Sequence, residues 1–224
     1  MKGQIRLGTL YRKIILSQLT ENKNHGGLRV LDVGCHDGYI LSTLDWPVKV
    51  GVDLEPLPGI TGVNLVRCDG RFPPFQKGCF DQIFAMDVIE HVLDDRSFAQ
   101  ALLDLLAPGG SLLVTTPSRD IRLFPPFLTR WVSHQWGHDY RLGYTCDELE
   151  ALFSQTGISI KIYSWRAAAY RTLYLLMRAL YPIWPAASRE MLDWVSKWDE
   201  KHHKGTHGYL FLEAVRQKPL QEPN

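Results

Sequence analysis

The sequence predicts an α/β fold in which a mostly parallel sheet carries helices on both faces. Apolar, β-branched runs of strand length alternate with helical stretches as far as residue 160, which is typical of strand–helix–strand units. The first of these runs, 28–33, leads directly into a turn that holds two glycines. Ligands of α/β proteins bind beside such turns, so the same observations indicate a binding site.

The elements follow in order from hydrophobic periodicity and turn residues. We expect strands at 28–33, 48–53, 63–67, 80–86, 111–116 and 158–164, and a final strand at 208–217. Helices are expected near 38–45, 95–106 and 146–156. The last helix has its own signals, because Thr145 and Glu148 form a capping-box pair and Gly157 provides a stop.

The N-terminal segment, 1–27, is predicted to contribute one helix. Apolar positions between Ile5 and Leu19 are mixed with Arg6, Arg12 and Lys13, which indicates an amphipathic helix rather than a cleaved targeting segment. We expect this helix to cover the sheet, and the alternative is that it forms a wall of the ligand site.

Size and composition exclude several classes of protein. A chain of 224 residues suffices for a single domain, 1–224, with a core at 28–164 and room for a cap. A net charge of +1 gives no case for a nucleic-acid partner. The four cysteines form no C-x-x-C pair, and His202, His203 and His207 are loosely spaced, so no metal is expected. A reducing compartment, the cytoplasm, fits these features best.

The turn after the first strand indicates the kind of ligand. Gly34 and Gly38 let the backbone approach a ligand closely, and Asp53 ends the second strand, where a carboxylate can bind ribose hydroxyls. A dinucleotide site needs G-x-G-x-x-G to place a pyrophosphate on a helix N-terminus. Here His36 stands between the glycines, and Asp32 would repel a pyrophosphate but suits a cationic group. The ligand is therefore expected to be an adenosine that carries positive charge.

Five blocks in order resemble the class I S-adenosylmethionine-dependent methyltransferases, over about 28–157. The family's first motif, D-x-G-x-G-x-G, matches Asp32, Gly34 and Gly38, with His36 in place of the middle glycine. The other matches are Asp53 for the ribose acid, Asp69 for the adenine-side acid, 80–92 for the fourth motif, and 106–114 for the Pro-Gly-Gly turn into the fifth strand.

The resemblance implies a Rossmann-like sheet of seven strands with an antiparallel last strand, and S-adenosylmethionine as the cofactor. The residues expected to bind it are Asp32, Gly34, His36, Gly38, Asp53, Leu54, Asp69, Gly70, Met86 and Asp87. Leu54 is expected at one face of the adenine, and Met86 and Asp87 near the methionine part. The His36 side chain either points away from the donor or crowds it, and we favour a tolerated variant.

Two segments hold candidates for the chemistry of the methyl acceptor. His138, in the loop after the fifth strand, is expected to be a base, because an imidazole titrates near neutral pH. Arg141 and Tyr144 are expected to orient an anionic or hydroxylated acceptor. His91 could reach the acceptor from the turn after the fourth strand. The alternatives are a loop held by its own hydrogen bonds and a histidine that orients the next helix.

The segment 165–207 is predicted to be a helical aromatic cap before the final strand. It holds the tryptophans Trp165, Trp184, Trp194 and Trp198, and its apolar part is interrupted by arginines and ended by prolines, which argues against a membrane span. A helix buried against the domain or a partner, a lid over a hydrophobic acceptor, and a peripheral membrane contact all remain open.

These features together predict a methyltransferase that acts on a small organic or lipid-like acceptor, most readily at oxygen. A catalytically silent methyltransferase-like subunit that serves a partner through its aromatic cap is the alternative, and His36 is the feature that keeps it open. A nicotinamide dehydrogenase fits less well because the glycine spacing differs. An oligomer is possible, since an apolar helix in the cap could also serve a dimer.

Overall fold

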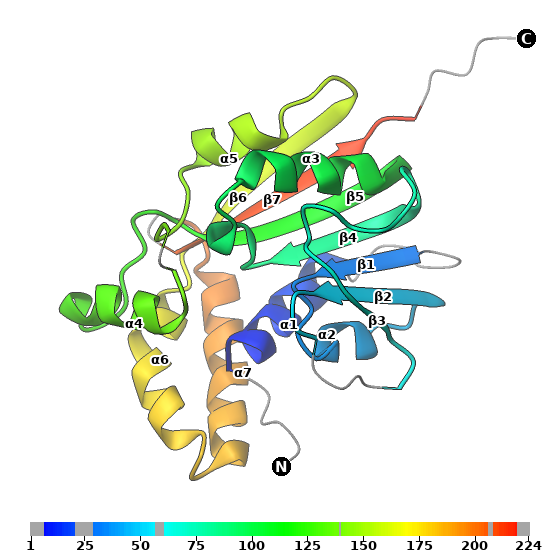
Figure 1. Cartoon of the computed structure of the whole chain (residues 1–224). Coiled ribbons are helices and arrows are strands. Elements are labelled where there is room, and N and C mark those ends of the chain that lie inside the picture. The colour runs from blue at the N-terminus through cyan, green and yellow to red at the C-terminus, as the bar shows by residue number, and fades with distance from the viewer. Residues whose placement is uncertain (1–6, 21–28, 57–60, 139, 206–207, 219–224) are drawn as a thin grey trace, which may run out of the picture. The chain divides into compact units, whose positions relative to one another are not determined.

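A computed structural model of the chain (Figure 1) describes residues 7–20, 29–56, 61–138, 140–205 and 208–218. Seven strands form one sheet in the order β3-β2-β1-β4-β5-β7-β6. Their bounds are β1 Arg29–Val33, β2 Val48–Asp53, β3 Asn64–Arg67, β4 Phe80–Met86, β5 Leu106–Pro117, β6 Ile158–Trp165 and β7 Tyr209–Arg216. The first five strands in this order pair in parallel, and β7 runs antiparallel between β5 and β6. The predicted Rossmann-like sheet is confirmed.

The strand register brings the carboxyl ends of β1, β2 and β4 to one edge of the sheet. Val33 of β1 lies opposite Val52 of β2 and Ala85 of β4. Because these strands are parallel, the loops that follow them emerge side by side. The expected ligand-binding turns therefore lie at the same edge.

The helices largely follow the predicted periodicity. Their bounds are α1 Leu7–Thr20, α2 Tyr39–Ser42, α3 Asp95–Leu105, α4 Thr129–Gln135, α5 Cys146–Phe153, α6 Ala168–Leu180 and α7 Pro185–Lys201, with 3-10 turns η1 Ile89–His91 and η2 Pro126–Leu128. The capping box that starts α5 is present, since Thr145 and Glu148 exchange both side-chain-to-backbone bonds. Helix α2 ends at Ser42, earlier than expected, and a 3-10-type bond from Thr43 to Ile40 closes its last turn.

The core forms between the sheet and the helices α3 and α5. Ile83 and Leu112 from the sheet and Phe98 from α3 are all fully buried in one apolar cluster. Burial of a side chain of this size stabilises the fold by about 1.5–3 kcal/mol. Gly70 belongs to this packing, because a Cβ there would lie 2.8 Å from the Phe98 ring and 2.9 Å from Val33. The core thus fixes the loop that follows β3.

The chain divides into two compact units, which we call the sheet unit and the helical unit. The helical unit consists of α1, the segment 117–143 with η2 and α4, and the segment 164–209 with α6 and α7. The sheet unit contains the rest of the described chain, and with it the predicted cofactor-binding residues. Helix α1, expected to cover the sheet, groups with α7 in the helical unit.

A buried polar cluster holds the helical unit together. The Asp199 carboxylate, fully buried on α7, accepts hydrogen bonds from the backbone N–H groups of Ala169 (2.8 Å) and Tyr170 (3.0 Å) at the start of α6. It also accepts from the Tyr11 hydroxyl of α1 at 2.9 Å, and the Tyr11 ring stacks on Tyr170 at 4.0 Å. One carboxylate therefore joins three helices. Burial raises the pKa of Asp199 above its ordinary value.

Candidate functional site

The candidate cofactor site is formed by the loops after β1, β2, β3 and β4. Each loop begins at the carboxyl end of a parallel strand, which is where ligands bind in open α/β sheets. The predicted residues Asp32, Gly34, His36, Gly38, Asp53 and Asp87 all lie in or directly after these strands. Asp32 itself is buried within β1, opposite Gly51 and Phe84.

Gly34 has the conformation and surroundings that only glycine tolerates. Its φ is 78°, and a Cβ there would lie 2.3 Å from Cγ2 of Val88, in the turn after β4. The N–H groups of Gly34 and Cys35 both donate to the Val52 carbonyl, at 2.8 and 3.1 Å. The β1 loop is thereby held against β2 by its main chain, and the Val88 side chain lies directly beside Gly34.

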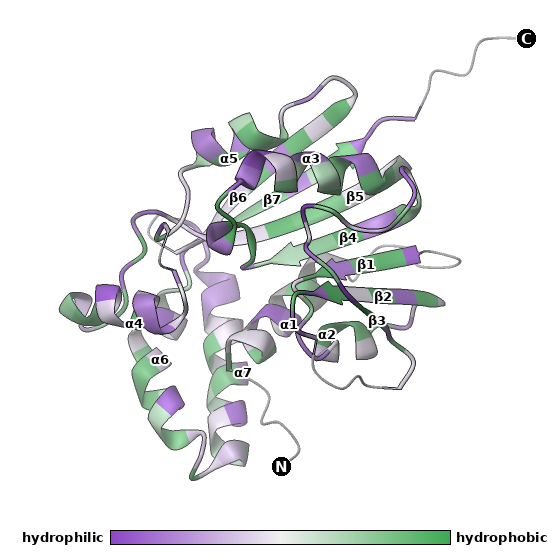
Figure 2. Ribbon diagram, viewed as in Figure 1, coloured by the Kyte–Doolittle hydropathy of each residue, from purple (hydrophilic) through white to green (hydrophobic). Residues whose placement is uncertain are grey.

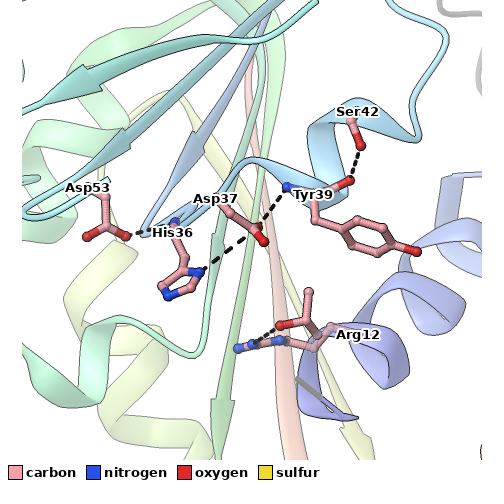
Figure 3. A network of polar contacts seen from close by, with 7 residues as sticks. Arg12, His36, Asp37, Tyr39, Ser42 and Asp53 are labelled. Atoms are coloured by element: carbon pink, nitrogen blue, oxygen red, sulfur yellow. Dashed lines mark hydrogen bonds and ion pairs between the residues drawn. The ribbon is translucent and has the colours of Figure 1, made fainter. Parts of the chain in front are cut away.

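His36 occupies a backbone conformation that usually belongs to glycine. Its φ is 54°, a left-handed value that histidine adopts more readily than most residues. Its backbone N–H donates to Oδ2 of Asp53 at 2.9 Å, and its imidazole, 40% exposed, approaches the Asp37 carboxylate at 4.0 Å (Figure 3). The backbone N–H at position 36 therefore holds Asp53 although histidine stands where the motif has its middle glycine.

Asp53 is held at the end of β2 by two main-chain donors. Oδ2 accepts from His36, and Oδ1 accepts from the N–H of Glu55 at 3.0 Å. The carboxylate is half-buried, so its remaining lone pairs face partly toward solvent. Leu54, the next residue, is 64% exposed and offers an apolar surface beside the carboxylate. The end of β2 thus presents a fixed carboxylate with an exposed apolar neighbour.

The loop then turns into α2 through Gly38. Its φ is 74°, and it stands directly before the first residue of α2. The Asp37 carboxylate accepts from the N–H of Tyr39 at 3.0 Å, and the Ser42 hydroxyl donates to the Tyr39 carbonyl (Figure 3). The bond from Asp37 satisfies the first N–H of α2, a short helix whose start lies in the candidate site.

Asp69 is already ion-paired. The guanidinium of Arg71 donates to both of its carboxylate oxygens, with a shortest distance of 2.6 Å, and the Arg71 N–H donates at 2.9 Å. These hydrogen bonds hold the pKa of the Asp69 carboxyl below its ordinary value. A ligand amine at Asp69 would have to share the carboxylate with Arg71.

The turn after β4 also has a strained backbone. Asp87 has a φ of 52°, and its N–H donates to the carbonyl of Thr115 in β5 at 2.9 Å. The Thr115 hydroxyl in turn donates to Oδ1 of Asp87 at 2.8 Å. Met86, just before it, is buried in the sheet. Strained residues held in this way often lie at ligand sites.

Two residues that sequence reasoning missed, Thr115 and Val88, support this turn. Thr115 orients Asp87, and Val88 closes the space above Gly34. The threonine pair 115–116 at the end of an apolar strand was an available signal, because hydroxyls at the carboxyl end of a buried strand need partners. Thr116 also donates to the fully buried Glu90 carboxylate at 3.1 Å.

Tyr144 occupies a different environment from the one expected. Its side chain is 1% exposed and packs in the apolar core, and its hydroxyl donates to Asp95 at 3.0 Å and to the Ile89 carbonyl at 3.3 Å. This environment favours a structural role in the sheet unit. His91 is half-buried in η1, where its N–H bonds to the Val88 carbonyl.

His138 and Arg141 belong to the helical unit. His138 is nearly buried after α4, its N–H donates to the Ser133 carbonyl at 3.1 Å, and its ring lies 5.6 Å from that of Trp136. Arg141 is half-buried. Their catalytic roles remain predictions. Directly after α7, ring nitrogens of His202 and His203 donate to the carbonyls of Trp198 and Glu200, whereas His207 lies outside the described residues.

Several curated relatives of this chain share one description. A ubiquinone biosynthesis O-methyltransferase of Dinoroseobacter shibae is 28% identical over 192 residues, covering 70% of this chain and 72% of that protein. One of Bradyrhizobium diazoefficiens is 26% identical, covering 59% of this chain and 62% of that protein. The mitochondrial human protein of this description is 29% identical over 108 residues, which is 40% of this chain and 29% of its own length. The chain thus spans less than two thirds of some of these relatives.

Solved structures share the fold at low sequence identity. Phosphoethanolamine N-methyltransferase 2 of Haemonchus contortus, in complex with S-adenosyl-L-methionine, has a TM-score of 0.62 and 20% identity, covering 91% of this chain and 52% of that one. The [4+2]-cyclase SpnF has a TM-score of 0.59 and 18% identity, covering 97% and 84%. Since a cyclase and a methyltransferase both have this fold, the fold alone does not determine the reaction.

The family is shown by the sequence itself. The profile described as "Methyltransferase domain" matches residues 4–161, which is well over half of the chain. This match includes every loop of the candidate cofactor site and agrees with the family that the motifs resemble. The chain therefore belongs to the methyltransferase-domain family.

Proposed function

We propose that this chain transfers a methyl group from S-adenosylmethionine to an oxygen of a small, lipid-like organic acceptor. The observation that carries the proposal is the bond from the His36 main chain to Asp53, beside the glycine turn at Gly34. The substitution of the middle motif glycine leaves this arrangement in place. Relatives named ubiquinone biosynthesis O-methyltransferase support oxygen as the acceptor atom and a lipid-like acceptor.

The residues of the sheet unit fit the proposed donor. Asp53 would accept hydrogen bonds from the ribose hydroxyls through its remaining lone pairs, and the exposed Leu54 would pack on the adenine. Gly34 leaves room for the methionine part to approach the main chain, while Asp32 supplies negative charge near an ammonium group. The bound donor would supply an activated methyl, so the chain's main task is alignment of the acceptor.

A base for the acceptor hydroxyl is the second part of the proposal. His138 and His91 are the candidates, because a neutral imidazole can accept a phenol proton near neutral pH. Arg141 would orient an anionic acceptor. The core position of Tyr144 makes it a support for η1 and α3 rather than a direct contact. Replacing His138 or His91 by glutamine should identify the base through the pH dependence of kcat.

We also propose the cytoplasm as the location. The four cysteines, Cys35, Cys68, Cys79 and Cys146, are free thiols, which suits a reducing compartment. Burial raises the pKa of the Cys35 thiol, so this residue acts as a small apolar side chain.

Titration calorimetry with S-adenosylmethionine tests the donor site first. We expect micromolar binding, a loss of roughly 30-fold in Asp53→Ala and no binding of NAD. Methyl transfer is then measured to phenols with and without an apolar tail. Donor binding without transfer to any acceptor would favour the alternative, a silent binding subunit. Absence of donor binding would refute the proposed site.

A further inference from the structure

Exposed apolar side chains are concentrated in the helical unit. Of the thirteen large apolar side chains that are exposed among the described residues, eight belong to this unit. Six of them lie on two segments, and we call these six the docking surface. They are Phe124, Phe127 and Trp131 around η2 and α4, and Leu176, Ile183 and Trp184 around the end of α6 and the turn into α7.

The two segments of the docking surface are neighbours within the helical unit. The indole N–H of Trp136, just after α4, donates to the Tyr174 hydroxyl of α6 at 2.8 Å. The N–H of Phe124 donates to the Arg171 carbonyl at 3.2 Å. Figure 1 shows α4 beside α6 accordingly. These hydrogen bonds therefore fix the two segments relative to each other.

The exposed side chains occupy the positions that a docking element needs. Phe127 and Trp131 are four residues apart on one continuous helical run and are 80% and 55% exposed. Ile183 and Trp184 stand in the turn between α6 and α7, 65% and 62% exposed. Figure 2 shows apolar residues, in green, among those of α4 and α6. Such aromatic tips insert well into the interface of a bilayer.

The charge of the same two segments is positive, with the acidic residues Asp120, Asp139 and Glu190 at their borders. Residues 121–138 contain Arg122 and Arg130 and no acidic residue, and residues 166–189 contain four arginines and no acidic residue. Arg130, Arg178 and Arg189 are exposed close to the docking surface. The chain as a whole has a net charge of only +1, so this separation of charge is local. Cations among exposed aromatic side chains match an anionic lipid surface.

Within the described ranges, none of the helices combines the length and the hydropathy of a transmembrane span. We propose that the helical unit binds peripherally to membranes that contain anionic lipids, with Ile183 and Trp184 inserted among the headgroups and the surrounding arginines on lipid phosphates. The inference does not need catalysis, but it would place a lipid-like acceptor where it is most concentrated.

Vesicle flotation with the full chain tests the proposal. The parent protein is expected to bind phosphatidylcholine vesicles that contain about 30 mol% phosphatidylglycerol, and to dissociate as salt is added. The double variant Ile183→Ser/Trp184→Ser should bind at least about tenfold more weakly. The control is Trp194→Ser, an equally exposed tryptophan beside Asp193 on α7, and it should bind like the parent.

Charge variants provide an independent test. Arg178→Gln and Arg189→Gln should each weaken binding by about fivefold and reduce its salt dependence. Failure of the parent to bind anionic vesicles, or equal binding by the double variant, would overturn the proposal. So would a dimer, in sedimentation velocity, that Trp184→Ser dissociates, because a second copy would then be the occupant. Titration of the same variants with S-adenosylmethionine shows whether the donor site is intact. A loss of membrane binding is thereby distinguished from a failure of the proposed methyl transfer.

Discussion

The sheet unit and the helical unit use opposite means to build their functional surfaces. In the sheet unit the main chain does most of the positioning, since backbone N–H groups hold Asp53 and a glycine is required at position 34. In the helical unit side chains do the positioning. The buried Asp199 carboxylate joins the helices, and aromatic side chains are exposed on the surface. A contact that a backbone N–H makes, such as the one from His36 to Asp53, survives replacement of the side chain at that position, whereas a contact made by a side chain is lost with it.

The largest effect is expected at Asp199. Asp199→Ala removes a buried acceptor from two N–H groups and the Tyr11 hydroxyl, so we expect a loss of about 3 kcal/mol in the free energy of unfolding. Urea unfolding followed by tryptophan fluorescence measures it. Asp193→Ala, on the same helix but exposed and paired with Lys197, is the control and should cost less than about 1 kcal/mol. Equal losses in both variants would contradict a special role for Asp199.

The next effect concerns the glycine turn. Gly34→Ala should destabilise the sheet unit by about 2–3 kcal/mol and weaken donor binding, because the new Cβ meets Val88 and the φ is left-handed. Thermal unfolding and calorimetry report the two effects. In the double variant Gly34→Ala/Val88→Ala the nearest clash is removed, so about half of the loss should be recovered. No recovery would mean that backbone strain alone sets the cost.

A smaller effect is expected at His36. His36→Gly relieves a left-handed residue while its backbone N–H still reaches Asp53, so stability should change by less than about 1 kcal/mol and donor affinity should be kept. The matched variant His36→Val places a β-branched side chain at the same φ and should lose stability. A large loss of affinity in His36→Gly would show that the imidazole itself binds the donor.

The smallest effect is expected at Asp69. Arg71 lowers the pKa of this carboxyl, so the pair stabilises the folded state above the unfolded pKa of about 3.9, and the contribution disappears as the pH falls through the lower folded pKa. The variant Asp69→Asn should therefore be slightly less stable than the parent at pH 7, by under about 1 kcal/mol, and equal to it at acidic pH. Thermal unfolding between about pH 2.5 and 7 measures the difference. A difference that persists at low pH would point to packing instead.

Sequence reasoning succeeded for the features that short stretches of sequence determine. The seven strands and the capping box at Thr145 follow from local patterns, because hydrophobic period and cap residues act over a few positions. The start of β5 differs from the expectation. Leu106 already pairs with Phe80, and the Pro-Gly-Gly stretch forms a bulge inside the strand rather than a turn before it.

Side-chain environments were harder to predict. Tyr144 looked like a ligand contact because it ends a loop rich in polar residues, yet its ring is buried and its hydroxyl bonds to Asp95. Asp69, expected on the adenine side of the cofactor, is paired with Arg71 only two residues away. No periodic signal states which side of a loop faces the core, or which of several cations meets an acid. Such outcomes depend on packing that the whole fold decides.

The bond from the His36 main chain to Asp53 has a consequence for protein engineering. Since an amide common to all residues except proline holds the acid, position 36 can be varied without loss of that bond. Residues that tolerate the left-handed φ of 54° would therefore change the side chain beside the donor turn while the bond to Asp53 stays in place. The side chain at position 36 can thus be exchanged to test which donor analogues the site accepts, without disturbing the carboxylate that the main chain holds.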